Sequence, residues 1–222
     1  APADNVTNFE GIQFLVENPY WEGAKISLYS AGEESIASMP NIKVGKFITQ
    51  VILQNIEVED IDLSNATDLR SAWVQNNPAL QKLDLSYSTI WGQGDKETEG
   101  NGTYGSSLMV LGCPILKEIK LPEKNELKAY RIDIECLDAL ETFDMSNVKM
   151  VAELSIGDLN KDFNLVYPEL TIFYSEDGYA GTYFACSENT FYRESTQAFL
   201  KANYTDIDPD DTVRRLGYTS SL

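Results

Sequence analysis

The chain has 222 residues, of which 43% are hydrophobic and 23% are charged, a composition typical of a folded globular protein. Its 17 basic and 35 acidic residues give a net charge of −18, which disfavours nucleic acid as a partner because phosphate groups attract basic side chains. Histidine is absent, which excludes a serine–histidine–aspartate triad and histidine-bound zinc within this chain, and no apolar run approaches the roughly 18 residues that would predict insertion into a membrane.

Residues 1–47 hold two strand-like segments, FEGIQFLVE and KISLYS, on either side of PYWEG. Because the open end of a repeat array exposes apolar core and strand edges, we expect this range to form an N-terminal β cap. The chain starts APADN, without methionine and without the basic-then-apolar layout of a signal peptide. This start fits a mature exported chain whose signal sequence has been removed.

From residue 48 onward the chain repeats one short pattern of three apolar residues, in which two residues separate the first from the second and one separates the second from the third. The clearest copies are Ile48/Val51/Leu53, Val58/Ile61/Leu63, Leu80/Leu83/Leu85, Leu116/Ile119/Leu121, Leu127/Tyr130/Ile132, Leu140/Phe143/Met145 and Val151/Leu154/Ile156. Several copies start 11 residues apart, which leaves no room for a helix, so each copy predicts a short strand followed by a turn. The polar, glycine-rich stretch 91–107 interrupts the series and is expected to be an inserted loop.

Stacked copies of this pattern predict a mainly β fold, a solenoid with two parallel sheets over residues 48–174. The alternative is an antiparallel β-sandwich, whose strands recur at similar distances but are joined by hairpin turns such as Asn-Gly. Asn101-Gly102 is the one such pair in the sequence, and it lies inside the expected loop. The pattern therefore favours the solenoid.

Two segments, IDLSNATDLRSAWVQNNPALQKLDLS and GCPILKEIKLPEKNELKAYRI, resemble leucine-rich repeats, and GCPILKEIKLP is similar to the BspA-like subclass of bacterial surface proteins. The chain departs from the family pattern in its long insertion, its irregular steps and its lack of a regular asparagine ladder. The resemblance implies a right-handed solenoid and a non-enzymatic, extracellular or cell-surface module that binds a protein or matrix ligand across an open face. A lipid anchor on the full-length form would suit that location. The alternative function is a glycan-binding accessory protein that uses exposed aromatic side chains.

Residues 175–222 are expected to form a C-terminal cap and tail. Within them STQAFLKANY, at 195–204, has helical spacing and predicts a short helix. The three cysteines, Cys113, Cys136 and Cys186, form no C-x-x-C pair, and we expect buried free thiols.

Outward positions of the predicted strands provide the candidate ligand-binding residues. On one sheet these are Asp62, Asp84, Lys120 and Asp144, each between two inward apolar residues. The aspartates either bind a cation or a cationic ligand, or form a solvated face compensated by Lys82 and Lys120, the interpretation that we favour. We add Trp73, at an outward position of the other sheet, and Trp91, at the start of the loop, because flat aromatic rings can stack on sugars. No catalytic residue, metal site or cofactor is predicted.

Overall fold

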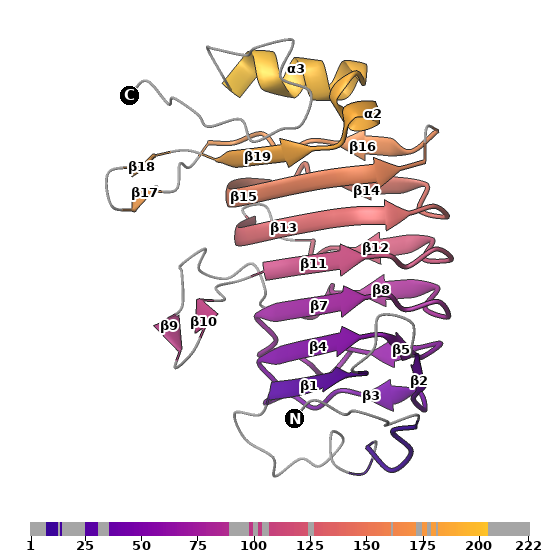
Figure 1. Ribbon diagram of the computed structural model, residues 1–222. Coiled ribbons are helices and arrows are strands. Elements are labelled where there is room, and N and C mark those ends of the chain that lie inside the picture. Colours follow the sequence, from indigo (N-terminus) through magenta and orange to yellow (C-terminus); the bar gives the residue numbers. More distant parts are fainter. Residues whose placement is uncertain are drawn as a thin grey trace.

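The computed structural model describes residues 8–12, 14, 25–30, 36–88, 98–99, 102–103, 107–123, 127–160, 162–171, 175–176, 179–180 and 182–203. In this part of the chain the protein is mainly β. A seven-stranded parallel sheet runs along the molecule, short strand pairs lie behind it, and two helices lie at its C-terminal end (Figure 1). None of the helices described is long and apolar enough to cross a membrane.

Each strand of the large sheet pairs with the strands before and after it in the sheet, always in parallel. The strands are β1 (Lys25–Tyr29), β4 (Gln50–Gln54), β7 (Ser71–Gln75), β11 (Ser107–Leu111), β13 (Leu127–Leu137), β15 (Val148–Leu159) and β19 (Tyr183–Cys186). Parallel neighbours require the chain to cross behind the sheet between strands, so this pairing is incompatible with the antiparallel sandwich. The longest crossover between β1 and β15 separates β7 from β11 and contains the stretch predicted to be an insertion, except for Ser107, which begins β11.

The crossovers carry short strands that also pair in parallel. They are β2 (Ala37–Ser38), β3 (Ile42–Lys43), β5 (Ile56–Glu57), β6 (Ile61–Asp62), β8 (Lys82–Asp84), β12 (Glu118–Lys120), β14 (Thr142–Asp144) and β16 (Asn164–Val166). We expected a continuous second sheet, whereas the described residues form the separate pairs β2–β5, β3–β6, β8–β12 and β14–β16.

The remaining strands form two small antiparallel hairpins. They are β9 (Thr98–Glu99) with β10 (Gly102–Thr103), and β17 (Ser175–Glu176) with β18 (Tyr179–Ala180). The first lies within the stretch expected to be an inserted loop.

The core lies between the large sheet and the short strands, and the repeated apolar residues fill it. Every residue of the seven clearest copies is buried except Leu121 and Tyr130, which are partly exposed. In β13 we expected Tyr130 and Ile132 to point inward, but the buried pair is Ile132 and Ile134. Leu127 and Ala129 are buried before Tyr130, and Ile132 and Ile134 are buried after it, so the alternation of β13 changes side between Ala129 and Ile132.

The ranges that we expected to be caps also supply strands to the sheet. Strand β1 lies within 1–47 and β19 lies within 175–222. Beyond β19 come α2 (Glu188–Phe191) and α3 (Glu194–Asn203), the latter close to the helix predicted at 195–204. The ring of Phe199 in α3 stacks on Tyr167 at 4.5 Å and lies 5.6 Å from Phe184, so this helix covers the apolar end of the core.

Five strands of the large sheet, β4, β7, β11, β13 and β15, have a residue in the left-handed backbone conformation at or directly beside their C-terminal end, which we call a corner. The equivalent corner residues are Asn55, Asn76, Gly112, Cys136 and Asp158, with φ between 46° and 62°. Asn76 Nδ2 donates to Asn55 Oδ1 at 2.8 Å, and Asn55 Nδ2 donates to the Ser30 carbonyl at 3.3 Å. A short asparagine ladder therefore joins the first turns, which the sequence pattern did not indicate.

The cysteines are free, as expected, and Cys113 and Cys186 are buried. The expectation of burial is wrong for Cys136, which is exposed. Cys136 lies one residue before the end of β13, in the left-handed conformation.

Candidate functional site

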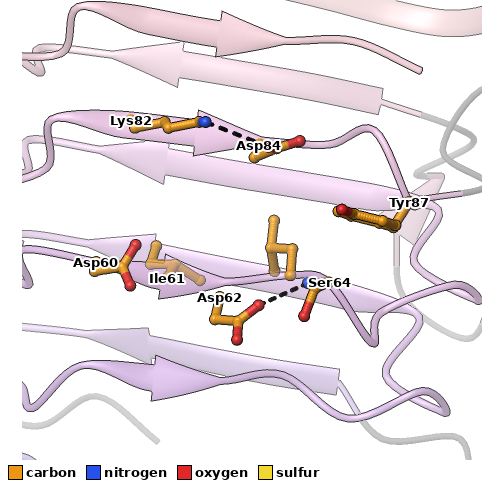
Figure 2. A pocket seen from close by; sticks show the side chains of 8 residues that line it. Asp60, Ile61, Asp62, Ser64, Lys82, Asp84 and Tyr87 are labelled. Carbon is orange, nitrogen blue, oxygen red and sulfur yellow. Dashed lines mark hydrogen bonds and ion pairs between the residues drawn. The ribbon is translucent and has the colours of Figure 1, made fainter. Parts of the chain in front are cut away.

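Two of the predicted aspartates border one hollow on the face formed by the short strands, which we call the short-strand face. The hollow has a volume of about 260 Å³. Its polar and aromatic lining comprises Asp60, Asp62, Ser64, Lys82, Asp84 and Tyr87 (Figure 2). Asp62 ends β6 and Asp84 ends β8, so the repeat brings residues 22 positions apart in the sequence to one place.

The aspartates also hold the turns that follow their strands. Asp62 Oδ1 accepts a hydrogen bond from the backbone N–H of Ser64 at 2.9 Å, and Asp84 Oδ1 accepts one from Ser86 at 3.1 Å. Asp144 makes the same contact with the backbone N–H of the serine two residues later, at 2.8 Å. An Asp or Asn side chain that accepts from the residue two positions on stabilises a turn. The Asp-x-Ser spacing thus has a structural role that our sequence analysis missed.

Lysines balance the charge of both aspartates in the hollow. Lys43 Nζ lies 3.2 Å from Asp62 Oδ2, and Lys82 Nζ lies 3.4 Å from Asp84 Oδ2. Lys82 Nζ also lies 3.3 Å from Glu118 Oε2. The compensation that we expected from Lys82 is present, and Lys120 lies in register with Asp84 on the neighbouring strand.

Hydrogen bonds keep the two carboxylates ionised. Side-chain and backbone hydrogen bonds from Ser64, helped by Lys43, hold the pKa of Asp62 below its usual value. Partial burial alone would raise the pKa of Asp84, but the hydrogen bonds from Ser86 and the charge of Lys82 outweigh it and lower that pKa. Both aspartates of the hollow are therefore ionised at neutral pH and paired with their lysines.

The other predicted residues lie elsewhere. Asp144 is exposed in β14 and is not part of the hollow. Trp73 is half-buried in the large sheet, where its Nε1 donates to Ser107 Oγ at 3.3 Å. Trp91 lies outside the described residues. The candidate residues therefore do not form a single site.

The solvent side of the large sheet, which we call the outer face, is a second surface that the sequence analysis singled out only at Trp73. Its central column runs in register through Ile52, Trp73, Met109, Asp133 and Ser155. The first three side chains form a half-buried apolar strip, and the column then becomes polar. Side chains alternate between the two faces of a strand, so a shift of one residue would put different residues on this face. The neighbours in the column are therefore known only from the pairing of the strands.

Within the described residues, no group of three or more aspartate, glutamate or cysteine side chains is arranged to hold a metal ion. No protein-family model, curated protein or solved structure matches the chain.

Proposed function

We propose that the protein is a non-catalytic interaction module, a right-handed solenoid of the leucine-rich-repeat type, that binds a protein ligand across its short-strand face. The stepwise parallel sheet and the buried repeat residues support the fold part of the proposal. An extracellular or cell-surface location belongs to the same proposal and depends on the resemblance of the repeats to bacterial surface proteins.

The hollow beside Tyr87 is the observation that carries this function. Tyr87 is 54% exposed although it is a large aromatic residue, and the carboxylates of Asp62 and Asp84 lie around it. Tyrosine is enriched among the residues that contribute most to protein–protein affinity. The turns held by the aspartates fix the surroundings of the ring, which lowers the conformational cost of binding.

The same hollow favours a glycan as the second candidate ligand. An exposed tyrosine ring offers an apolar surface on which a sugar ring can stack, and neighbouring carboxylates can accept hydrogen bonds from sugar hydroxyls. The two candidates differ in ligand class and make the same prediction for Tyr87.

The proposal is tested by binding the chain to immobilised fibronectin, laminin and type I collagen, and in parallel to a glycan array. Tyr87→Ala should weaken binding by roughly tenfold or more, the range expected for a central aromatic residue. Asp84→Asn should also weaken it while keeping an oxygen for the turn, as Asn77 Oδ1 does when it accepts from the N–H of Ala79 at 3.0 Å.

Asp144→Asn is the matched control, because Asp144 holds the same kind of turn but lies outside the hollow. Its binding should equal that of the unmodified chain. Binding to matrix proteins alone supports the first candidate, and binding to glycans alone replaces it with the second. The short-strand face would be eliminated by an absence of binding on both panels, or by equal binding of the Tyr87→Ala variant.

A further inference from the structure

The outer face contains a carboxylate whose buried oxygen lacks a hydrogen-bond partner. Asp133, in the middle of β13, is only 5% exposed, and within the described residues its Oδ1 accepts no hydrogen bond. Asp133 lies between the inward residues Ile132 and Ile134, so its side chain belongs to the outer face. A buried charged oxygen without a donor is costly, and an incoming donor would remove that cost.

The residues around Asp133 add negative charge and remain accessible. Glu135 follows two positions later on the same side of β13, and Glu153 lies on the adjacent strand β15 opposite Arg131. Glu135 and Ser155 are partly exposed, and the side chain of Glu153 is 38% exposed. Asp133 is therefore the floor of a site whose rim faces solvent.

Arg131 shows that a guanidinium group fits beside these carboxylates. Its Nη2 lies 2.7 Å from Asp133 Oδ2, and its Nη1 lies 3.7 Å from Glu153 Oε2. One guanidinium thus occupies the Oδ2 side of Asp133, whereas Oδ1 has no donor in the described part of the chain. Two carboxylates, those of Asp133 and Glu153, pair with this single positive charge, and Glu135 adds a third negative charge beside Asp133, so a second cation would balance the site.

The pKa of Glu135 is raised, in part by the same excess of negative charge. Burial and the nearby charges of Asp133 and Asp158 raise its pKa, although a hydrogen bond from Ser155 Oγ at 3.0 Å opposes the change. Gly157, its neighbour on β15, leaves the space in which the Glu135 side chain lies, because an added Cβ would come within 3.2 Å of it. Glu135 is therefore held beside Asp133 by packing as well as by its position on the strand.

We propose that Asp133, Glu135 and Glu153 form a binding site for the guanidinium or ammonium group of an arginine or lysine side chain from a basic peptide or protein. The apolar strip that ends at Met109, the neighbour of Asp133 on β11, receives the hydrocarbon part of the same ligand. The net charge of −18 draws basic ligands toward the molecule. This site lies on the large sheet (Figure 1), away from the hollow, and does not depend on the function proposed for the short-strand face.

The test uses acetyl-arginine amide as the probe and acetyl-citrulline amide as its uncharged analogue. The reporter is the ¹³C methyl signal of Met109, assigned by its loss in Met109→Leu. The arginine probe should shift this signal in a saturable manner, and the citrulline probe should leave it unchanged. Equal shifts with both probes, or no shift with arginine, would overturn the proposal.

Asp133→Asn should weaken binding of the arginine probe by roughly tenfold or more, since it removes the charge at the floor of the site. Because the new amide can donate to Glu135, this variant should unfold at the same urea concentration as the unmodified chain or at a higher one. Glu135→Gln, at the half-buried rim, is the second variant and should also weaken binding. Asp144→Asn should bind the probe normally. Unchanged binding in both site variants, or displacement of the probe by an equal concentration of calcium, would refute the proposed site.

Discussion

Replacing Gly112 by alanine tests whether the left-handed corners stabilise the stack of turns. Gly112 has φ of 62°, and a Cβ added there would lie 2.5 Å from Oδ1 of Asn76, the corner residue of the preceding strand. That side chain donates to Asn55 at 2.8 Å, so a methyl group at 112 must displace the asparagine ladder as well as strain the backbone.

Both effects can be estimated. The left-handed conformation costs an L-residue about 1 kcal/mol, even after allowance for the lower entropy of alanine in the unfolded chain. Loss of the hydrogen bond between Asn76 and Asn55 costs about 1 kcal/mol more. Gly112→Ala should therefore lower the free energy of unfolding by about 2 kcal/mol.

Urea unfolding followed by circular dichroism measures this change, and a double-mutant cycle separates its two parts. With Asn76→Ala already present, Gly112→Ala should cost only about 1 kcal/mol, because the ladder is already lost. Gly11→Ala is the control: its φ is 98°, but no atom lies within 4 Å of the added Cβ, so its cost should be the same with and without Asn76. An identical cost of Gly112→Ala in both backgrounds would refute the role assigned to the ladder.

Three further results follow from the structure. Because the pKa of Asp84 is lowered in the fold, its stabilising effect should be complete above pH about 4 and be lost as the pH falls further; Asp84→Asn should remove this part of the acid dependence of urea unfolding, and an unchanged acid profile would contradict it. A thiol reagent such as Ellman's reagent should label the exposed Cys136 first, whereas Cys113, whose pKa burial raises to about 11, and the buried Cys186 should react only on unfolding; loss of the fast phase in Cys136→Ser checks the assignment. Phe184→Ala should lower the free energy of unfolding by about 3 kcal/mol in urea titrations, because its ring is fully buried against Phe199; a loss below about 1 kcal/mol would show that α3 does not depend on this contact.

The spacing of apolar residues predicted the part of the core that the repeat copies form. Residues such as Leu80, Leu83 and Leu85 are buried because a strand alternates its sides, and this alternation can be read from the sequence. The pattern failed at Tyr130, because the alternation of buried residues in β13 changes side between Ala129 and Ile132. Such an irregularity depends on how neighbouring strands pair, so the sequence of one strand does not reveal it.

The candidate sites were less predictable for the same reason. The aspartates of the Asp-x-Ser turns could be selected from the sequence, yet only the stacking of β6 and β8 brings Asp62 and Asp84 to one hollow beside Tyr87. Asp133 and Glu153 carried no sequence signal, because they are 20 positions apart and meet only through the pairing of β13 with β15.

The sequence by itself determined that this chain is mainly β and repetitive and that the apolar residues of its repeats are buried, because these properties depend on local spacing. The tertiary structure decided which outward side chains meet. Register, bulges and left-handed corners set the contacts between turns. Those contacts create the hollow at Tyr87, the ladder at Asn55 and Asn76, and the burial of Asp133, whose Oδ1 accepts no hydrogen bond within the described residues.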